Sequence, residues 1–277
     1  MPKEVTKTIH RYLRHDKKFP HVWCPGCGNG IVLGALIRAL NRLGLKKDEI
    51  VLASGIGCSA RMPVYVDANT LHTTHGRALT FATGIKLAKP LLTIITIMGD
   101  GDATAIGGNH FIHAARRNLD LTALIINNQI YGMTGGQFSP TTPYGCHAAT
   151  APYGHIEHAF SVAELAVTAG ASFVARSTVY HANLLDKLIE DAILKRGFSV
   201  VEVISNCHVQ FGRRNKMGDP VTMMKWMRDH AVTVKKAKKM TPESLEDKFT
   251  IGILTDREKP VYTEEYQKIR ERAGSKL

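Results

Sequence analysis

The stretch LLTIITIMGDGD, residues 91–102, decides the fold class of this chain. Its first eight residues are all apolar or β-branched, a length and composition typical of a strand that is buried on both faces. The glycines that follow let the backbone turn tightly, and Asp100 places a carboxylate at the end of the strand. A buried strand that ends in a polar turn predicts a parallel sheet with a ligand site at the strand ends.

The segments around this stretch alternate between helical and strand patterns. Apolar residues recur at three- and four-residue spacing in the predicted helices, whereas short apolar runs mark the predicted strands. The helices are predicted over residues 30–43, 76–88, 107–117, 161–169 and 182–195, and the strands over 49–53, 91–98, 121–127, 172–179 and 199–204. This alternation favours an α/β fold, a mostly parallel sheet with helices on both faces.

The two ends of the chain lack this alternation. Residues 1–20 and 208–277 are charged and poorly periodic, so we expect an N-terminal extension, a cofactor domain over residues 21–207 and a C-terminal extension that wraps a partner. Residues 131–158 are dense in Gly, Pro and Thr and predict a long functional loop.

Composition excludes several classes of protein. Of the 277 residues, 44% are hydrophobic and 22% are charged, which is ordinary for a globular protein. We expect a cytoplasmic protein without a membrane segment, since no apolar run could cross a bilayer and no signal-peptide pattern is visible. The net charge of +12 indicates solvated ends or an acidic protein partner. Nucleic acid is not expected, because no zinc-finger spacing or RNA-binding aromatic motif accompanies the charge.

The Gly99–Asp102 turn does not match the common nucleotide motifs. Thr104 stands where a dinucleotide fingerprint needs its third glycine, and no Gly-Lys-Ser/Thr triplet of a P-loop follows. The next predicted strand ends in Asn127-Asn128. Side-chain oxygens of Asp100 and Asn128, with the backbone carbonyl of Ile130, would supply half of an octahedral Mg²⁺ shell, and a diphosphate and water the rest.

The cysteines suggest a second site. Cys24 and Cys27 form a C-x-x-C pair, and Cys58 and Cys207 each follow a predicted strand, whereas Cys146 lies in the long loop. Structural disulfides are not expected in a cytosolic chain. The residues themselves leave open an iron–sulfur cluster, a zinc ion or unliganded thiols. The wide spacing favours a cluster within an enzyme over a local zinc module.

The chain resembles the thiamine-diphosphate enzymes in its G-D-G and N-N pair. With the cysteines added, it resembles the β subunit of 2-oxoacid:ferredoxin oxidoreductases, most of all the 2-oxoglutarate type. The resemblance covers about residues 20–210 and is carried by WCPGCG at 23–28, GIGCS at 55–59, THGR at 74–77, GDGD at 99–102, and NN at 127–128 with YGMTGGQFSPTT at 131–142.

This resemblance implies thiamine diphosphate, Mg²⁺ and one [4Fe–4S] cluster. The implied cluster ligands are Cys24, Cys27, Cys58 and Cys207, and the implied cofactor-binding residues are Ile56, Gly57, Cys58, Ser59, His75, Gly101, Asp102, Gly132 and Met133. The resemblance also implies catalytic roles for two residues that could otherwise be ordinary structural or surface side chains. His75 would contact the cofactor, and Arg61 would hold the distal carboxylate of a dicarboxylic substrate.

The implied reaction is the reversible, CoA-dependent oxidative decarboxylation of 2-oxoglutarate to succinyl-CoA and CO2, with electrons passed through the cluster to ferredoxin. An α subunit would supply the glutamate that activates thiamine, in a dimer of αβ heterodimers. A pyruvate or broad-range 2-oxoacid enzyme is one alternative. A cluster-free thiamine-dependent decarboxylase or carboligase is another, and a non-catalytic metal-binding module is the third.

Overall fold

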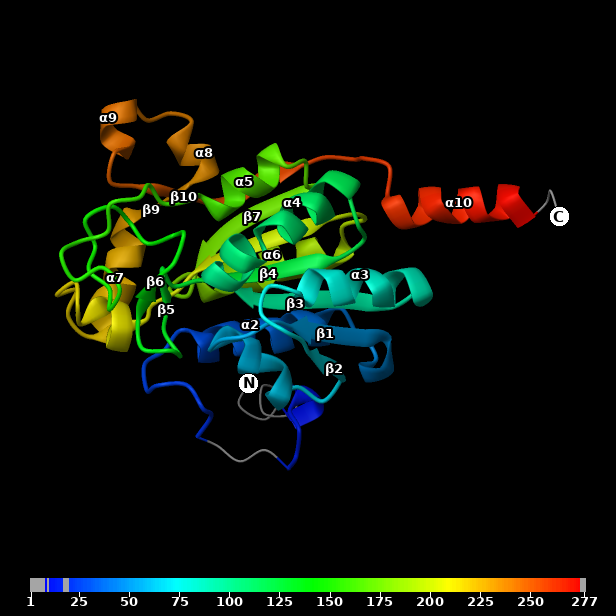
Figure 1. Cartoon of the computed structure of the whole chain (residues 1–277), viewed down its shortest axis with the longest axis horizontal. Helices are drawn as coiled ribbons and strands as arrows, with labels where there is room; N and C mark the ends of the chain where they lie inside the picture. The colour runs from blue at the N-terminus through cyan, green and yellow to red at the C-terminus, as the bar shows by residue number, and fades with distance from the viewer. Residues whose placement is uncertain (1–7, 9, 17–19, 275–277) are drawn as a thin grey trace.

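The computed structural model describes residues 8, 10–16 and 20–274, and its centre is an eight-stranded sheet (Figure 1). The strand order is β2-β1-β3-β4-β8-β7-β10-β9. The first six strands in this order, which are β2, β1, β3, β4, β8 and β7, run parallel to one another. β10 is antiparallel to β7, and β9 is parallel to β10. The strands are β1 (Ile50–Ser54), β2 (Asn69–His72), β3 (Thr93–Gly99), β4 (Thr122–Asn127), β7 (Phe173–Thr178), β8 (Ser199–Ile204), β9 (Ala231–Thr233) and β10 (Phe249–Asp256).

Helices cover both faces of the sheet, and each face has its own apolar core. The residues of β3 alternate between the two cores: Ile95 and Ile97 pack with α2 and α6, whereas Ile94 and Met98 pack with α3, α4 and α5. Both sets are buried, which explains why the strand is continuously apolar. The helices are α2 (Asn29–Arg42), α3 (Ala78–Ala88), α4 (Gly108–Arg117), α5 (Val162–Thr168) and α6 (Ala182–Leu194).

The predicted fold class is confirmed, and the predicted elements lie within a few residues of the observed ones. The strand predicted over 199–204 has the same bounds as β8, and the helix predicted over 30–43 is α2. Two features were not predicted. A π-helical turn, Asp102–Ile106, precedes α4, and the short edge strand β2 is mostly exposed and carries no apolar run. The long loop contains a small hairpin of β5 (Ile130–Tyr131) and β6 (Gln137–Phe138).

The chain beyond residue 207 is more regular than its sequence indicates. It forms α7 (Pro220–His230), β9, α8 (Val234–Ala237), α9 (Pro242–Leu245), β10 and α10 (Tyr262–Gly274). β10 pairs with β7 and so extends the central sheet. The sequence pattern did not reveal this strand because its burial is only partial and irregular. α10 projects from the body of the molecule (Figure 1), and a role of this region in wrapping a partner stays a prediction.

The described part of the N-terminal extension also joins the core. Tyr12 is fully buried, and its hydroxyl donates to the carbonyl of Leu45 at 2.8 Å. Leu13 forms an isolated antiparallel bridge with Val66. Residues 1–7, 9 and 17–19 of this extension lie outside the described residues. Within residues 8, 10–16 and 20–274, no helix has both the length and the apolar composition to cross a membrane.

The sheet contains a point where the strand order reverses. The chain passes from β1 to β2 on one side, and then returns to β3 on the other side of β1. In open parallel sheets, ligands bind outside the carboxyl ends of the strands at such a reversal. The segments after β1, β3, β4 and β8 are therefore the place to look for a site.

Candidate active site

Asp100, which directly follows β3, is a buried charged group at this edge. It is 2% exposed, and its Oδ2 accepts hydrogen bonds from the hydroxyls of Ser139 at 2.5 Å and Thr141 at 2.7 Å. Within the part of the chain that the structure describes, its Oδ1 accepts one hydrogen bond, from the backbone N–H of Asn128 at 3.4 Å. Burial raises the pKa of Asp100 above its usual value, although these donors oppose the rise. A nearby cation would favour the charged form, so the carboxylate suits a metal ion.

Asp102 connects two of the loops that form the site. Its Oδ1 accepts the backbone N–H of Ile56 at 3.3 Å, the backbone N–H of Gly76 at 2.7 Å, and a hydrogen bond from Nδ1 of His75. Ile56 follows β1, whereas His75 and Gly76 follow β2. Asp102 therefore fixes the loops after β1 and β2 relative to each other. Its Oδ2 is buried and has no hydrogen-bond partner among residues 8, 10–16 and 20–274.

The two asparagines after β4 have different surroundings. Asn127 is buried, and its Nδ2 donates at 2.8 Å to Glu202, which forms a buried ion pair with Arg176. The Oδ1 of Asn127 accepts the N–H of Gln129, a residue with a φ of 64°. Asn128 is half-buried, and its Oδ1 accepts the N–H of Ile130 at 3.3 Å. Asn127 thus holds the turn in place, and Asn128 lines the cavity described next.

A cavity of about 120 Å³ lies at the carboxyl ends of β1, β3 and β4. Its walls include every residue predicted to hold thiamine diphosphate or Mg²⁺, which are Ile56, Gly57, Cys58, Ser59, His75, Asp100, Gly101, Asp102, Asn128, Ile130, Gly132 and Met133. Tyr131, which was not predicted, also lines it and donates from its hydroxyl to the carbonyl of Gly101 at 3.1 Å. Burial raises the pKa of Tyr131 to about 12, so it remains a neutral donor.

Two glycines at this site are required by close contacts with neighbouring side chains. A Cβ on Gly101 would lie 2.3 Å from the ring of Tyr131, and a Cβ on Gly55 would lie 2.0 Å from Oδ2 of Asp102. Separations this short are far inside van der Waals contact, so neither position accepts a side chain without movement.

We expect Gly55→Ala to destabilise the fold by about 1–3 kcal/mol, the usual cost of overpacking. Asp102 cannot easily withdraw from the new methyl group, because its other oxygen accepts three hydrogen bonds. Gly84→Ala is the matched control, since Gly84 lies inside α3 with open space around its Cα. There alanine should stabilise by roughly 0.5–1 kcal/mol. Denaturant unfolding of both variants measures the difference, and equal effects would refute the assigned contact.

A second cavity, of about 330 Å³, is lined by four cysteines from distant parts of the chain. Cys24 and Cys27 come from the loop before α2, Cys58 from the loop after β1, and Cys207 from the loop after β8. All four are free thiols, and Cys24 is exposed. Cys146 does not line this cavity. The sequence-predicted ligand set is therefore brought together around one space.

The surroundings of the cysteines fit a group that carries positive charge. Burial, with a smaller contribution from the neighbouring sulfurs, raises the pKa of Cys27 to about 12 and that of Cys58 to about 11. Thiolates could persist there only beside a cation. In the described part of the chain, no three His, Cys, Asp or Glu side chains lie close enough to share one metal ion. Four cysteines from three separate loops around one space are the ligand set that a [4Fe–4S] cluster needs.

The two cavities share a wall. Cys58, Asn128, Gly132 and Met133 line both of them. Within this wall, the backbone of Gly132 lies close to two of the cysteine sulfurs. A Cβ on Gly132 would lie 3.3 Å from Sγ of Cys207 and 3.8 Å from Sγ of Cys58. Groups bound in the two cavities would thus lie on either side of this shared wall.

Arg61 lies apart from the other predicted residues. It is on a 3-10 helix, Ser59–Tyr65, with its side chain exposed, and it lines neither cavity. Its backbone N–H donates to the carbonyl of Cys58 at 3.3 Å, which keeps it close to the cysteine loop. Its role in substrate binding stays a prediction.

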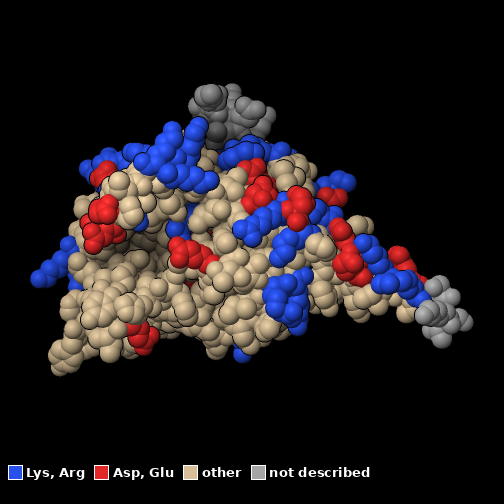
Figure 2. Space-filling model, turned by 90° about the horizontal axis from the view of Figure 1, so that it is seen from above, with Lys and Arg blue, Asp and Glu red and all other residues tan. Residues whose placement is uncertain are grey.

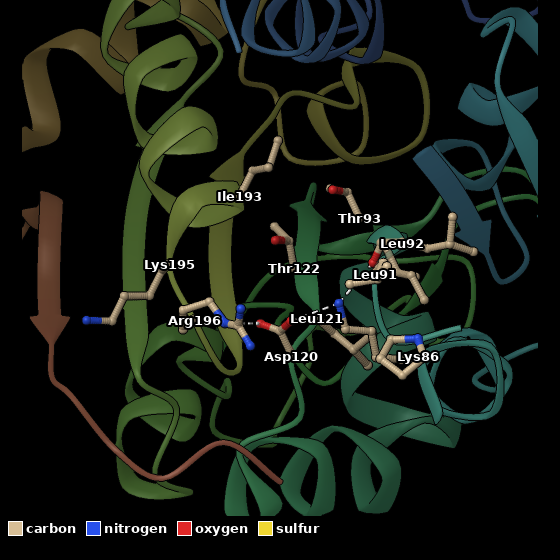
Figure 3. A pocket seen from close by; sticks show the side chains of 12 residues that line it. Lys86, Leu91, Leu92, Thr93, Asp120, Leu121, Thr122, Ile193, Lys195 and Arg196 are labelled. Atoms are coloured by element: carbon tan, nitrogen blue, oxygen red, sulfur yellow. Dashed lines mark hydrogen bonds and ion pairs between the residues drawn. The ribbon is translucent and has the colours of Figure 1, made fainter. Parts of the chain in front are cut away.

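Another pocket, of about 210 Å³, lies at the opposite edge of the sheet, at the amino ends of β3 and β4 (Figure 3). Asp120 lies between Lys86, at 2.8 Å, and Arg196, at 3.8 Å. Lys195 pairs with Asp256 and Glu258, and Arg196 also pairs with Glu264. Every charged side chain in this pocket is in an ion pair, so the pocket looks structural.

Comparisons with known proteins agree with this geometry. Residues 55–203 match the thiamine pyrophosphate enzymes, C-terminal TPP binding domain. The chain is 50% identical over 265 residues to the 2-oxoglutarate synthase subunit KorB of Methanothermobacter marburgensis, which covers 95% of this chain and 93% of the relative. It is 40% identical to the 2-oxoacid:ferredoxin oxidoreductase subunit beta of Saccharolobus solfataricus, over 85% of this chain and 77% of the relative.

A solved structure has the same architecture. The 2-oxoglutarate:ferredoxin oxidoreductase from Magnetococcus marinus, with 2-oxoglutarate, coenzyme A and succinyl-CoA bound, matches with a TM-score of 0.85 and 34% identity. The match covers 96% of this chain and 90% of that one. The chain therefore belongs to the thiamine pyrophosphate enzymes, in the family of the KorB and beta subunits of 2-oxoglutarate and 2-oxoacid:ferredoxin oxidoreductases.

Proposed function

We propose that the chain is the β subunit of a 2-oxoglutarate:ferredoxin oxidoreductase, an enzyme that converts 2-oxoglutarate and CoA to succinyl-CoA and CO2. The observation that carries this proposal is the pair of adjoining cavities. One is lined by Asp100 and Asn128, and the other by Cys24, Cys27, Cys58 and Cys207. A thiamine enzyme that passes single electrons to a protein needs both sites, and needs them close together.

Asp100, Asn128 and the backbone carbonyl of Ile130 would hold Mg²⁺ and, through it, the diphosphate of the cofactor. Carboxylate, amide and carbonyl oxygens are the ligands that this hard cation prefers. Thiamine diphosphate supplies the carbanion and electron sink for decarboxylation. The four cysteines would hold a [4Fe–4S] cluster, which supplies single-electron transfer.

His75 is oriented for a role at the cofactor. Its Nδ1 donates to Asp102, which fixes the ring and leaves Nε2 free to interact elsewhere. The ring of Tyr131 lies edge-on to it, with the centroids 5.9 Å apart. Held in this way, the imidazole can exchange a hydrogen bond or a proton with a group bound in the cavity.

An α subunit would complete the site. The cofactor cavity of about 120 Å³ is smaller than the range of about 300–1,000 Å³ typical of ligand pockets, as expected of a site shared between chains. The loop over residues 131–160 carries one charged residue, Glu157, and exposes Tyr153 at 99% and Ile156 at 80%. In Figure 2, uncharged side chains predominate at the lower left of the molecule, whereas Lys and Arg gather along the upper side. Such a surface suits burial against a partner, and we expect a dimer of αβ heterodimers.

Electrons would leave through the cysteine loop. Val22, Cys24, Pro25 and Gly26 are exposed there, so an external ferredoxin could approach the cluster closely. The exposed Arg213, Arg214 and Lys216 follow Cys207 within nine residues and favour an acidic partner. We expect the reaction to take place in the cytoplasm.

We expect Arg61→Ala to weaken the use of 2-oxoglutarate and to affect pyruvate much less. An arginine can bind a carboxylate through two hydrogen bonds, and pyruvate lacks the distal carboxylate. Losing such a charged contact costs about 1.5–3 kcal/mol, roughly a 10–100-fold loss in kcat/KM. Steady-state rates with both 2-oxoacids measure this preference. Arg116→Ala, in the exposed last turn of α4, serves as the control. Unchanged preference in the Arg61 variant would remove Arg61 from the substrate site.

The cofactor content of the anaerobically purified complex tests the proposal. The expected result is thiamine diphosphate together with iron and acid-labile sulfide. Thiamine diphosphate without iron would instead identify a cluster-free decarboxylase or carboligase. Zinc without thiamine diphosphate would identify a non-catalytic metal-binding module.

A further inference from the structure

The two carboxylate oxygens of Asp100 differ in the hydrogen bonds that they accept. Two hydroxyls donate to Oδ2, those of Ser139 at 2.5 Å and Thr141 at 2.7 Å, and these hydroxyls lie 3.0 Å from each other. Among the described residues, Oδ1 accepts one hydrogen bond, the long 3.4 Å contact from the N–H of Asn128. One oxygen of the carboxylate is thus occupied by protein donors, and the other is left for a ligand.

The two hydroxyls are held by a closed turn. The N–H of Thr142 donates to the carbonyl of Ser139 at 3.0 Å, and the N–H of Ser139 donates to Oγ1 of Thr142 at 2.9 Å. Oγ1 of Thr142 in turn donates to the carbonyl of Gln129 at 2.6 Å. The turn is therefore tied to the end of β4, the same segment that provides Asn128 and Ile130.

Ser139 and Thr141 are 0% and 2% exposed, and neither lines the cofactor cavity. They contact Asp100 from behind and would not touch the metal or the cofactor. Their effect on the site must act through the orientation of that carboxylate.

We infer that Ser139 and Thr141 make Asp100 a one-oxygen ligand, and that they thereby select Mg²⁺ over Ca²⁺ at this site. The inference rests on the proposed function, in which Asp100 binds the metal. Mg²⁺ takes six ligands at about 2.0–2.1 Å in strict octahedral geometry, whereas Ca²⁺ takes six to eight at about 2.3–2.6 Å and often binds both oxygens of a carboxylate. The two hydroxyls bound to Oδ2 disfavour binding of Ca²⁺ through both carboxylate oxygens. They also fix the orientation of the carboxylate, which keeps Oδ1 at one corner of the octahedron that Mg²⁺ requires.

Removing the hydroxyls should change the choice of metal. Side chains that orient a metal ligand typically contribute about 10–100-fold to metal affinity. In the Ser139→Ala and Thr141→Val double variant, we expect Mg²⁺ affinity to fall by about that factor. Ca²⁺ affinity should fall much less or rise, since the freed Oδ2 can then bind. The ratio of Mg²⁺ to Ca²⁺ affinity should therefore fall by at least about 10-fold.

The test uses the complex formed by the full chain and follows the retention of thiamine diphosphate as Mg²⁺ or Ca²⁺ is titrated. Thr150→Ala is the matched control, because its hydroxyl bonds the N–H of Phe138 in the same loop but does not reach Asp100. Thr141→Ser keeps the hydroxyl and should retain the wild-type preference. If the double variant does not fold, the single Thr141→Val variant compared with Thr141→Ser carries the test.

Equal losses for both cations, or unchanged affinities, would overturn the inference while leaving the proposed function standing. A wild-type complex that binds thiamine diphosphate without any divalent cation would overturn the proposed metal site, and the inference with it.

Discussion

Replacing Asp100 by asparagine is expected to abolish Mg²⁺-dependent retention of thiamine diphosphate and to leave the fold intact. Asparagine has nearly the same shape, and its amide oxygen can still accept from Ser139 and Thr141. Burial alone raises the pKa of Asp100, so removing its charge should not destabilise the apo protein. Because Asp100 would bind the metal directly, the loss of affinity should exceed the ~10–100-fold typical of an indirect contact.

Two measurements on the same sample separate these effects. Mg²⁺ titration with bound thiamine diphosphate as the readout should show the loss, and thermal unfolding without ligands should show an unchanged or higher Tm. Asp229→Asn is the control, since Asp229 forms an exposed ion pair with Arg228 and surface pairs contribute about 0–1 kcal/mol. Normal cofactor binding by the Asp100 variant would exclude Asp100 as a metal ligand.

Replacing Cys207 by serine is expected to remove the iron that the β chain contributes to the complex. The four cysteines that line the larger cavity come from three separate loops, so losing one leaves three ligands for a cluster that needs four. Wild-type complex should contain about four iron and four sulfide per β chain beyond those of other subunits. The variant should lose this portion, together with its signal in the reduced, low-temperature electron spin resonance spectrum.

Cys146 provides a matched control for this experiment. It is a partly buried free thiol in the long loop and does not line the cavity. Cys146→Ser should therefore retain iron, sulfide and the spectroscopic signal. If Cys146→Ser lost iron and Cys207→Ser kept it, the assignment of the fourth ligand would be wrong.

The sequence predicted those parts of the site that depend on strand ends. Asp100 and Asn128 could be placed together because each directly follows an apolar run, and parallel strands carry their ends to one edge of a sheet. β3 was recognisable because both of its faces are buried, which leaves an uninterrupted apolar run. For β3, Asp100 and Asn128, the apolar run in the local sequence was enough to predict their place in the sheet.

Contacts between distant segments could not be predicted in this way. Ser139 and Thr141 lie 39 and 41 residues from Asp100, and a run of small hydroxyl residues in a loop does not reveal which carboxylate it meets. The link from Asp102 to His75 and Gly76 likewise depends on how the loop after β2 folds back. β10 was missed because its burial is irregular, so it lacks the alternation that marks a strand.

Part of the role of Asp102 also depends on contacts between distant segments, which the sequence does not reveal. The family resemblance implied cofactor binding by Asp102, and this residue does line the cavity. Its hydrogen bonds to the loops after β1 and β2 add a second role, which is to fix the shape of the site before any ligand arrives. The substrate contact that the resemblance implies for Arg61 stays a prediction, since its side chain is exposed and lies outside both cavities.

We expect the two adjoining sites to couple decarboxylation to electron transfer in one enzyme. This coupling can be measured in the anaerobic reaction of the complex with 2-oxoglutarate, CoA and oxidised ferredoxin. For each 2-oxoglutarate consumed, we expect one succinyl-CoA, one CO2 and two reduced ferredoxins, with a slower reaction for pyruvate. Release of CO2 without succinyl-CoA or reduced ferredoxin would show that the two sites are not coupled.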